Sequence, residues 1–169
     1  MNLPIWKSRA QEDAHLFNPA FCGALSYEFC KSYCKTADVE STELPILFCA
    51  LPLSLHLDTR DILPNRTVTS LYSWLEGNPK ALVGFAKRAQ NITPYIKEGV
   101  SYAVSRKCLD FAENGELILG VNKASFLPKF LENSTHEVRD IVSTTRFLGR
   151  WFAGASSSAT ILASWGISV

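Results

Sequence analysis

At three positions along the chain a helix-capping residue stands directly before a proline: Asn18-Pro19, Asn78-Pro79 and Thr93-Pro94. The side chain of Asn or Thr accepts hydrogen bonds from the free amide groups of a first helical turn. Proline fits the first helical position because no hydrogen-bond donor is needed there. We therefore predict helices that begin at residues 19, 79 and 94, and a chain that is mainly helical.

Apolar residues at helical spacing support this prediction. Phe21, Leu25, Phe29 and Tyr33 recur every four residues, which places them on one face of a helix that runs from residue 19 to about Cys34. The same pattern predicts inward stripes in the two later helices. These stripes are Leu82, Phe85, Ala89 and Ile92, and then Ile96, Val100 and Ala103.

Shorter helices are expected at residues 9–17 and 70–76, the second with Thr69 as its cap. Ser134-Thr135-His136-Glu137 matches a capping box, in which Ser134 and Glu137 would satisfy each other's amide groups, and predicts a helix to about Ala153. The tail from 155 to 169 is small and apolar, and it fits a helix or a strand equally well.

The most apolar segment, residues 44–57, is too short to cross a bilayer, which needs about 20 residues. It contains Pro45, Pro52 and His56, and it is long for a strand. Pro52 would also remove a hydrogen bond from a sheet. We predict a buried helix that kinks or restarts near Pro52, followed by a loop from Asp58 to Arg66.

One element is predicted to be a sheet. Asn114-Gly115 lies between apolar flanks, which is the strongest short signal for a β-hairpin. The sequence therefore predicts a mainly α fold with one short β-hairpin near residues 109–121, in a single compact helical domain that spans residues 1–169. A winged-helix-like arrangement, in which a hairpin follows packed helices, is an analogy for this order of elements.

No pattern of a catalytic or cofactor site stands out. The five cysteines include no Cys-x-x-Cys pair, and neither phosphate-binding glycine motif occurs. His56 beside Asp58 and Asp61 is the one weak alternative for a hydrolase. The amino terminus lacks the pattern of a secretory signal, and the odd number of cysteines suits a reducing compartment. We expect a cytoplasmic protein that is not an enzyme and has no catalytic residue, no cofactor and no metal.

Charge is distributed unevenly. The chain has a net charge of +1, yet residues 80–107 contain six basic side chains and one acidic one. Such a segment suits an acidic partner or the phosphates of DNA. A second candidate contact is Arg150-Trp151, because Arg and Trp often anchor interfaces, although Trp151 fits the core equally well. The candidate contacts are therefore Lys80, Lys87, Arg88, Lys97, Arg106, Lys107, Arg150 and Trp151.

Several blocks in order along the chain resemble a known family. They include Leu16-Phe17-Asn18-Pro19-Ala20-Phe21, Leu51-Pro52 through Leu55-His56 to Thr59-Arg60, Leu63-Pro64, Thr69-Ser70-Leu71 with Trp74, Phe85-Ala86-Lys87-Arg88-Ala89, Gly149-Arg150-Trp151-Phe152-Ala153, Thr160-Ile161 and Trp165-Gly166. Together they resemble the middle components of bacterial three-component ABC systems, the group that includes the small subunit of Lamassu defence systems.

The resemblance implies a small subunit that is encoded with an SMC-like or Rad50-like ABC ATPase and an effector, often a nuclease, in anti-phage or anti-plasmid defence. The ATPase and the effector would perform the chemistry, and this chain would bridge or regulate them. The alternative is a DNA-binding winged-helix-like module that contacts phosphates through the 80–107 segment, with no membrane involved in either case.

Overall fold

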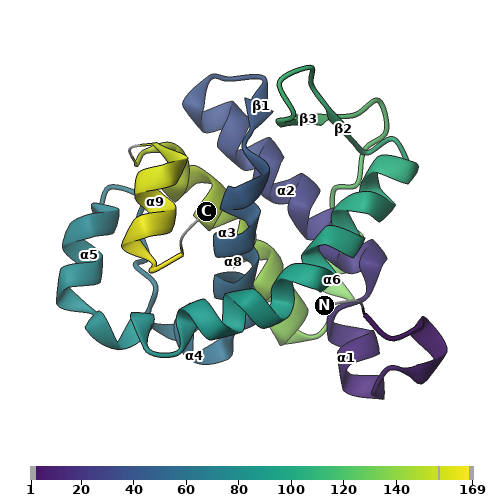
Figure 1. Cartoon of the computed structure of the whole chain (residues 1–169), viewed down its shortest axis with the longest axis horizontal. Coiled ribbons are helices and arrows are strands. Elements are labelled where there is room, and N and C mark those ends of the chain that lie inside the picture. Colours follow the sequence, from purple (N-terminus) through teal and green to yellow (C-terminus); the bar gives the residue numbers. More distant parts are fainter. Residues whose placement is uncertain (1–2, 156, 168–169) are drawn as a thin grey trace.

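The computed structural model of the chain describes residues 3–155 and 157–167. It is a compact helical domain with a small antiparallel sheet at one edge (Figure 1). The helices are α1 (Gln11–Leu16), α2 (Pro19–Ala37), α3 (Leu47–Leu55), α4 (Leu57–Ile62), α5 (Leu71–Gly77), α6 (Phe85–Ser105), α7 (Pro128–Glu132), α8 (His136–Ala153) and α9 (Ser158–Ser164). Short 3-10 turns are η1 (Trp6–Ser8), η2 (Leu44–Ile46) and η3 (Pro79–Leu82), and the strands are β1 (Ser41–Thr42), β2 (Leu109–Phe111) and β3 (Leu117–Leu119).

The central helix is α2, which packs extensively against α6 and α8. Its start is as predicted, because Asn18 Oδ1 accepts hydrogen bonds from the amides of Ala20 and Phe21. Glycines let the helices approach closely. A Cβ atom on Gly99 of α6 would lie 2.9 Å from the backbone nitrogen of Gly23, and one on Gly149 of α8 would lie 2.7 Å from the Phe29 carbonyl oxygen.

One ion pair joins two of these helices, and a second fastens the N-terminal segment to the third. Arg146 of α8 donates from Nε and Nη2 to the Glu28 carboxylate of α2, at 2.9 and 2.7 Å. Arg9 donates to the Glu98 carboxylate of α6 at 2.6 and 2.7 Å, which holds the N-terminal segment beside that helix. Phe17, which stacks on Tyr95 of α6, adds to the same contact.

An aromatic cluster joins α5, α6, α8 and α9. Trp74 contacts both Trp151 and Trp165, with ring centroids 5.5 and 6.1 Å apart, and Phe85 lies 4.8 Å from Trp165. The C-terminal tail, for which the sequence allowed a helix or a strand, is thus a helix docked on this cluster. Residues 156, 168 and 169 of that tail lie outside the described residues.

The hairpin is confirmed. Leu109 pairs with Leu119 and Phe111 with Leu117, and Gly115 has a φ of +81°, the left-handed conformation that the tight turn requires. No local pattern predicted β1, which pairs with β3 and makes the sheet three-stranded in the order β1-β3-β2. The Ser41 hydroxyl of β1 donates to Glu116.

The predicted helix start at Thr93-Pro94 is wrong, because α6 runs without a break from Phe85 to Ser105 with Pro94 inside it. Proline in a helix interior removes one backbone hydrogen bond. The buried stripe continues through the proline, however, as Phe85, Ala89, Ile96 and Val100 are all buried. The continuous packing of this stripe outweighs the lost hydrogen bond.

The predicted helix start at Asn78-Pro79 is also wrong. Pro79 opens only the 3-10 turn η3, the Asn78 side chain does not cap it, and α6 begins at Phe85. Leu82, which was predicted to face inward, is exposed.

Three other boundaries differ from expectation. Residues 58–62 of the predicted loop belong to α4, where the buried Arg60 donates to the Ser54 carbonyl at 2.9 Å. Pro52 lies inside α3, and the chain restarts a helix only at Leu57. The cap of α8 is Thr135, whose hydroxyl accepts from the Val138 amide, while the Ser134 hydroxyl donates to the Phe130 carbonyl. The cap is therefore one residue later than predicted, and with Val138 at the third helical position the reciprocal bond of a capping box does not form.

Candidate interaction surface

The outward face of α6 carries the most distinctive polar surface of the predicted 80–107 segment. Lys87, Gln90, Pro94 and Lys97 follow one another at intervals of three and four residues, so they lie on one face of the helix. Both lysines are exposed. With 21 residues, α6 is about 31 Å long, and the two lysines are separated by about 15 Å along its axis.

A groove runs beside this face. Its lining comes from α6, from Phe48 of α3 and from the chain just after α9, and it encloses a volume of about 590 Å³. A smaller hollow of about 410 Å³ continues it along α6. The Lys97 Nζ lies 5.8 Å from the centre of the Phe48 ring, a cation–π contact that joins the basic face to an apolar wall. The groove is lined by Phe48, Ala86, Lys87, Ala89, Gln90, Thr93, Lys97, Gly166 and Ile167.

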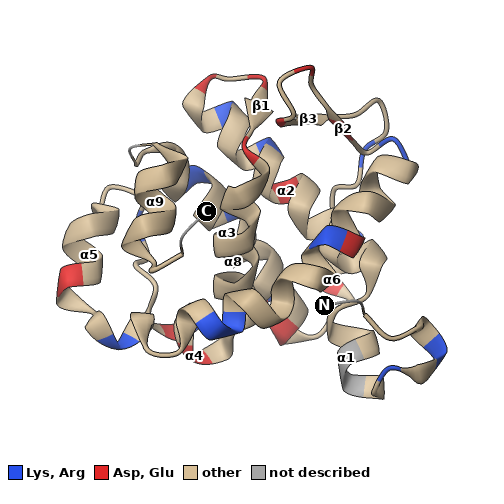
Figure 2. Cartoon of the chain, viewed as in Figure 1, with Lys and Arg blue, Asp and Glu red and all other residues tan. Residues whose placement is uncertain are grey.

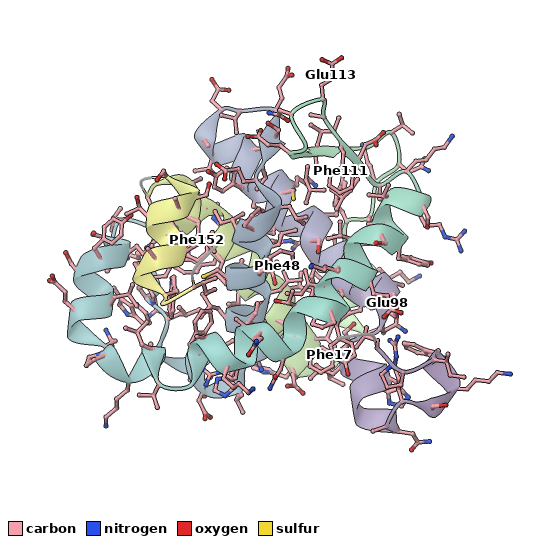
Figure 3. All side chains as sticks on the ribbon, viewed as in Figure 1. Phe17, Phe48, Glu98, Phe111, Glu113 and Phe152 are labelled. Carbon is pink, nitrogen blue, oxygen red and sulfur yellow. The ribbon has the colours of Figure 1, made fainter. Side chains whose placement is uncertain are left out.

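The groove is electrostatically positive. None of the residues that line it among the described part of the chain is acidic. Glu98 is next to Lys97 in sequence, but its carboxylate is engaged by Arg9 on the side of α6 that faces the N-terminal segment (Figure 3). An acidic or phosphate-bearing ligand would therefore meet two lysines without a competing carboxylate in the groove.

The other predicted cations of residues 80–107 lie apart from this groove. Figure 2 shows basic positions spaced along the molecule from η3, where Lys80 lies, to the end of α6, where Arg106 and Lys107 lie. Arg88 is half-buried and donates to the Val83 carbonyl at 3.0 Å, with its guanidinium 5.9 Å from the Phe85 ring. Arg88 thus secures the start of α6, and Arg106 rests over Tyr102.

The side chains of Arg150 and Trp151 lie in different environments. Trp151 is only 2% exposed, and its indole nitrogen donates to the Thr69 carbonyl at 2.6 Å. Of the two alternatives for Trp151, the core position is the one observed. Arg150 is exposed on α8, near Arg60, and does not line the α6 groove.

The His56 side chain is engaged by a neighbouring residue of the same segment. The His56 Nδ1 lies 2.9 Å from the Thr59 hydroxyl. Burial lowers the pKa of His56, and the charge of Arg88 lowers it further. This arrangement favours a neutral imidazole at physiological pH.

The sequence did not point to the groove itself. Phe48, Gly166 and Ile167 lie far from α6 in the chain and reach it only through the packing of α3 and α9. The helical spacing of polar residues between positions 87 and 97 was the signal in the sequence for the α6 side of the groove.

Among the residues whose placement is described, no group of three or more His, Cys, Asp or Glu side chains is arranged to hold a metal ion. None of the helices in that part is both long enough and apolar enough to span a membrane.

One of the comparisons with known proteins identifies a family. A family model described as ABC-three component (ABC-3C) system Middle Component 3 matches residues 6–169. No curated protein and no solved structure matches the chain. Because the family model covers nearly the whole sequence, the groove beside α6 and the aromatic core both lie within the matched region. The chain belongs to the Middle Component 3 family of ABC-three component systems.

Proposed function

We propose that this chain is a non-catalytic subunit of a bacterial, cytoplasmic defence complex, in which it bridges or regulates an SMC/Rad50-like ABC ATPase and an effector nuclease. The observation that carries the proposal is the family match over residues 6–169, since a middle component of a three-component system is one subunit of a larger assembly. Defence of the Lamassu type, against phage or plasmids, is the setting that the sequence resemblance implies.

We assign one of the partner contacts to the α6 groove. Its exposed lysines, Lys87 and Lys97, flank an apolar wall that includes Phe48. A mixed surface of this kind suits a partner segment that offers acidic side chains around an apolar one. Opposite charges at the rim of such an interface speed association and select the partner, while the apolar centre slows dissociation.

Coexpression with the ATPase encoded beside this chain tests the proposal. The wild-type chain should copurify with the ATPase at moderate salt. Lys87→Glu together with Lys97→Glu should reduce the recovered complex, because the reversed charges repel an acidic partner. Lys123→Glu makes the same kind of change at an exposed position away from the groove and should leave recovery unchanged. A wild-type chain that elutes alone would refute the proposed assembly. Equal recovery of all variants would refute the groove as a contact site for the ATPase.

A second candidate function is direct contact with DNA phosphates through the same lysines. The observation in its favour is the pair of exposed lysines on a groove whose described lining has no acid. Binding of this kind weakens steeply as salt rises, because each neutralised phosphate releases counterions. The purified chain should then bind a duplex at low salt, and the Lys87→Glu and Lys97→Glu pair should abolish that binding. No measurable affinity at low salt refutes direct contact and leaves the subunit proposal intact.

A further inference from the structure

The short helix α4 is polar on its buried side and apolar on its exposed side, which is the reverse of an ordinary surface helix. Thr59 and Arg60 are buried, and both side chains bond to the chain at the end of α3. Leu57 and Ile62, by contrast, are 54% and 41% exposed. The folding of a single chain therefore gives no reason for large apolar side chains at these two positions.

The exposed face of α4 also carries two acids (Figure 2). Asp58 and Asp61 are exposed, and neither carboxylate forms an ion pair within residues 3–155 and 157–167. At 3.6 residues per turn, residues 57, 58, 61 and 62 lie within an arc of about 140°, with the two acids between the two apolar side chains. We call this arc the α4 face. It presents two negative charges with a large apolar side chain at each edge.

The groove beside α6 has the complementary composition. Lys87 and Lys97 are exposed at it, and Phe48 and Ile167 contribute apolar walls. Its described lining contains no acid. The acids of the α4 face would therefore meet lysines in the groove, and its apolar edges would meet apolar walls. In one chain both surfaces face the solvent, so they come together only between two copies.

Two other exposed acidic segments match the groove less well. Val39 is exposed between Asp38 and Glu40, but it is a single apolar side chain. Phe111 of β2 is also exposed, but successive residues of a strand point to opposite faces, so Asp110 lies on the other face from it. Neither segment places two acids and two large apolar side chains on one face, as α4 does.

We propose that this chain associates with a second copy of itself, and that the α4 face of one copy occupies the α6 groove of the other. The inference rests on the proposed function in one respect, because it takes the α6 groove to be a contact surface, and it adds the occupant. Opposite charges select this pairing, and the apolar contacts hold it. An acidic segment of another subunit that enters the groove must then displace α4 of the second copy.

Sedimentation velocity of the full chain over a range of concentrations tests the proposal, and the wild type should self-associate reversibly. Lys87→Glu with Lys97→Glu should weaken association by more than about tenfold, because like charges then face each other across the contact. Asp58→Lys with Asp61→Lys should weaken it equally. An equimolar mixture of these two variants should associate again, since each reversed surface then meets its opposite. A variant that failed to fold would not be rescued by mixing.

Two further variants separate charge from apolar contact. Glu40→Lys with Glu43→Lys reverses two exposed acids outside the α4 face, so this matched control should associate as the wild type does. Leu57→Gln with Ile62→Gln keeps the acids and removes the apolar edges. It should weaken association at low and at high salt alike, because apolar contacts are not screened by ions.

A wild-type chain that stays monomeric at every concentration would overturn the proposal, and so would a mixture of the two reversal variants that stays monomeric. Copurification with the ATPase is measured separately. A monomeric chain that still copurifies in dependence on Lys87 and Lys97 would refute the self-association and leave the subunit role intact. A chain that self-associates through α4 but elutes without the ATPase would have the opposite meaning.

Discussion

Replacing Gly99 by alanine should destabilise the protein by forcing α2 and α6 apart. A Cβ atom at residue 99 would lie 2.6 Å from the Cys22 Cβ, 2.9 Å from the Gly23 nitrogen and 3.0 Å from the Cys22 carbonyl carbon. These neighbours belong to the backbone of α2 or are attached directly to it, so no side-chain rotation relieves the contact. The two helices must separate along a crossing that is otherwise tightly packed.

The magnitude follows from two opposing effects. Overpacking a core by one methyl group costs about 1 to 3 kcal/mol, and more when backbone must move. Alanine regains about 1 kcal/mol through its higher helix propensity. Because backbone movement is required here, we expect a net loss of about 2 kcal/mol, which corresponds to a fall in Tm of about 4 to 8 °C for a chain of this size.

Thermal and urea unfolding of the wild type and two variants measure this loss. The matched control is Gly77→Ala at the end of α5, where an added Cβ meets no heavy atom within 4 Å. That variant should be neutral or up to about 1 kcal/mol more stable. If Gly99→Ala were as stable as Gly77→Ala, the close approach of α2 and α6 would not exist as described.

Further predictions concern the ion pairs and the thiols. Arg146→Gln should lower the free energy of unfolding by about 2 kcal/mol in urea denaturation, because it leaves the nearly buried Glu28 carboxylate without its charged partner. Burial raises the pKa of Glu28, but the hydrogen bonds and charge of Arg146 outweigh burial and hold the pKa below its ordinary value of 4.5. This contribution to stability is complete above pH 4.5 and is lost as the pH falls through the lower pKa of the folded state. Wild type should therefore lose stability more steeply on acidification than Glu28→Gln. Parallel curves of the free energy of unfolding against pH for the two proteins would contradict this. Iodoacetamide should modify Cys108 in the native chain and the four buried cysteines only after denaturation, with mass spectrometry as the readout. Arg9→Gln should speed proteolysis of the segment before α2 while the rest stays protected, because the Glu98 contact is lost; an unchanged cleavage rate would show that the contact does not hold the segment.

Some local signals in the sequence predicted the structure correctly, because neighbours along the chain decide those features. The Asn18 cap, the stripe of α2 and the hairpin at Asn114-Gly115 each depend on residues within a few positions of one another. The helical class and the short sheet followed from them. The match of the family model is in line with the family that the motif blocks resembled.

Other elements depend on contacts with distant residues, which local patterns do not contain. Pro94 was expected to start a helix, but the packing of the stripe on both sides of it keeps α6 continuous. Ser41 and Thr42 form a strand only because Ile118 and Leu117 are placed beside them. Charge counts identified residues 80–107 as a basic segment, but helical geometry decides that Lys87 and Lys97 share a face while Arg88 folds back on Val83.

The position of Trp165 has a consequence for the groove beside α6. Trp165 is buried against Trp74 and Phe85, and the next two residues, Gly166 and Ile167, form one wall of the groove. The wall exists only while α9 is docked, so docking of this helix and occupation of the groove are thermodynamically linked. A ligand that binds the complete groove must stabilise α9 by the same free energy by which α9 improves the ligand's affinity. Slower hydrogen exchange at the amides of α9 would thus report occupation of a surface that those amides do not touch.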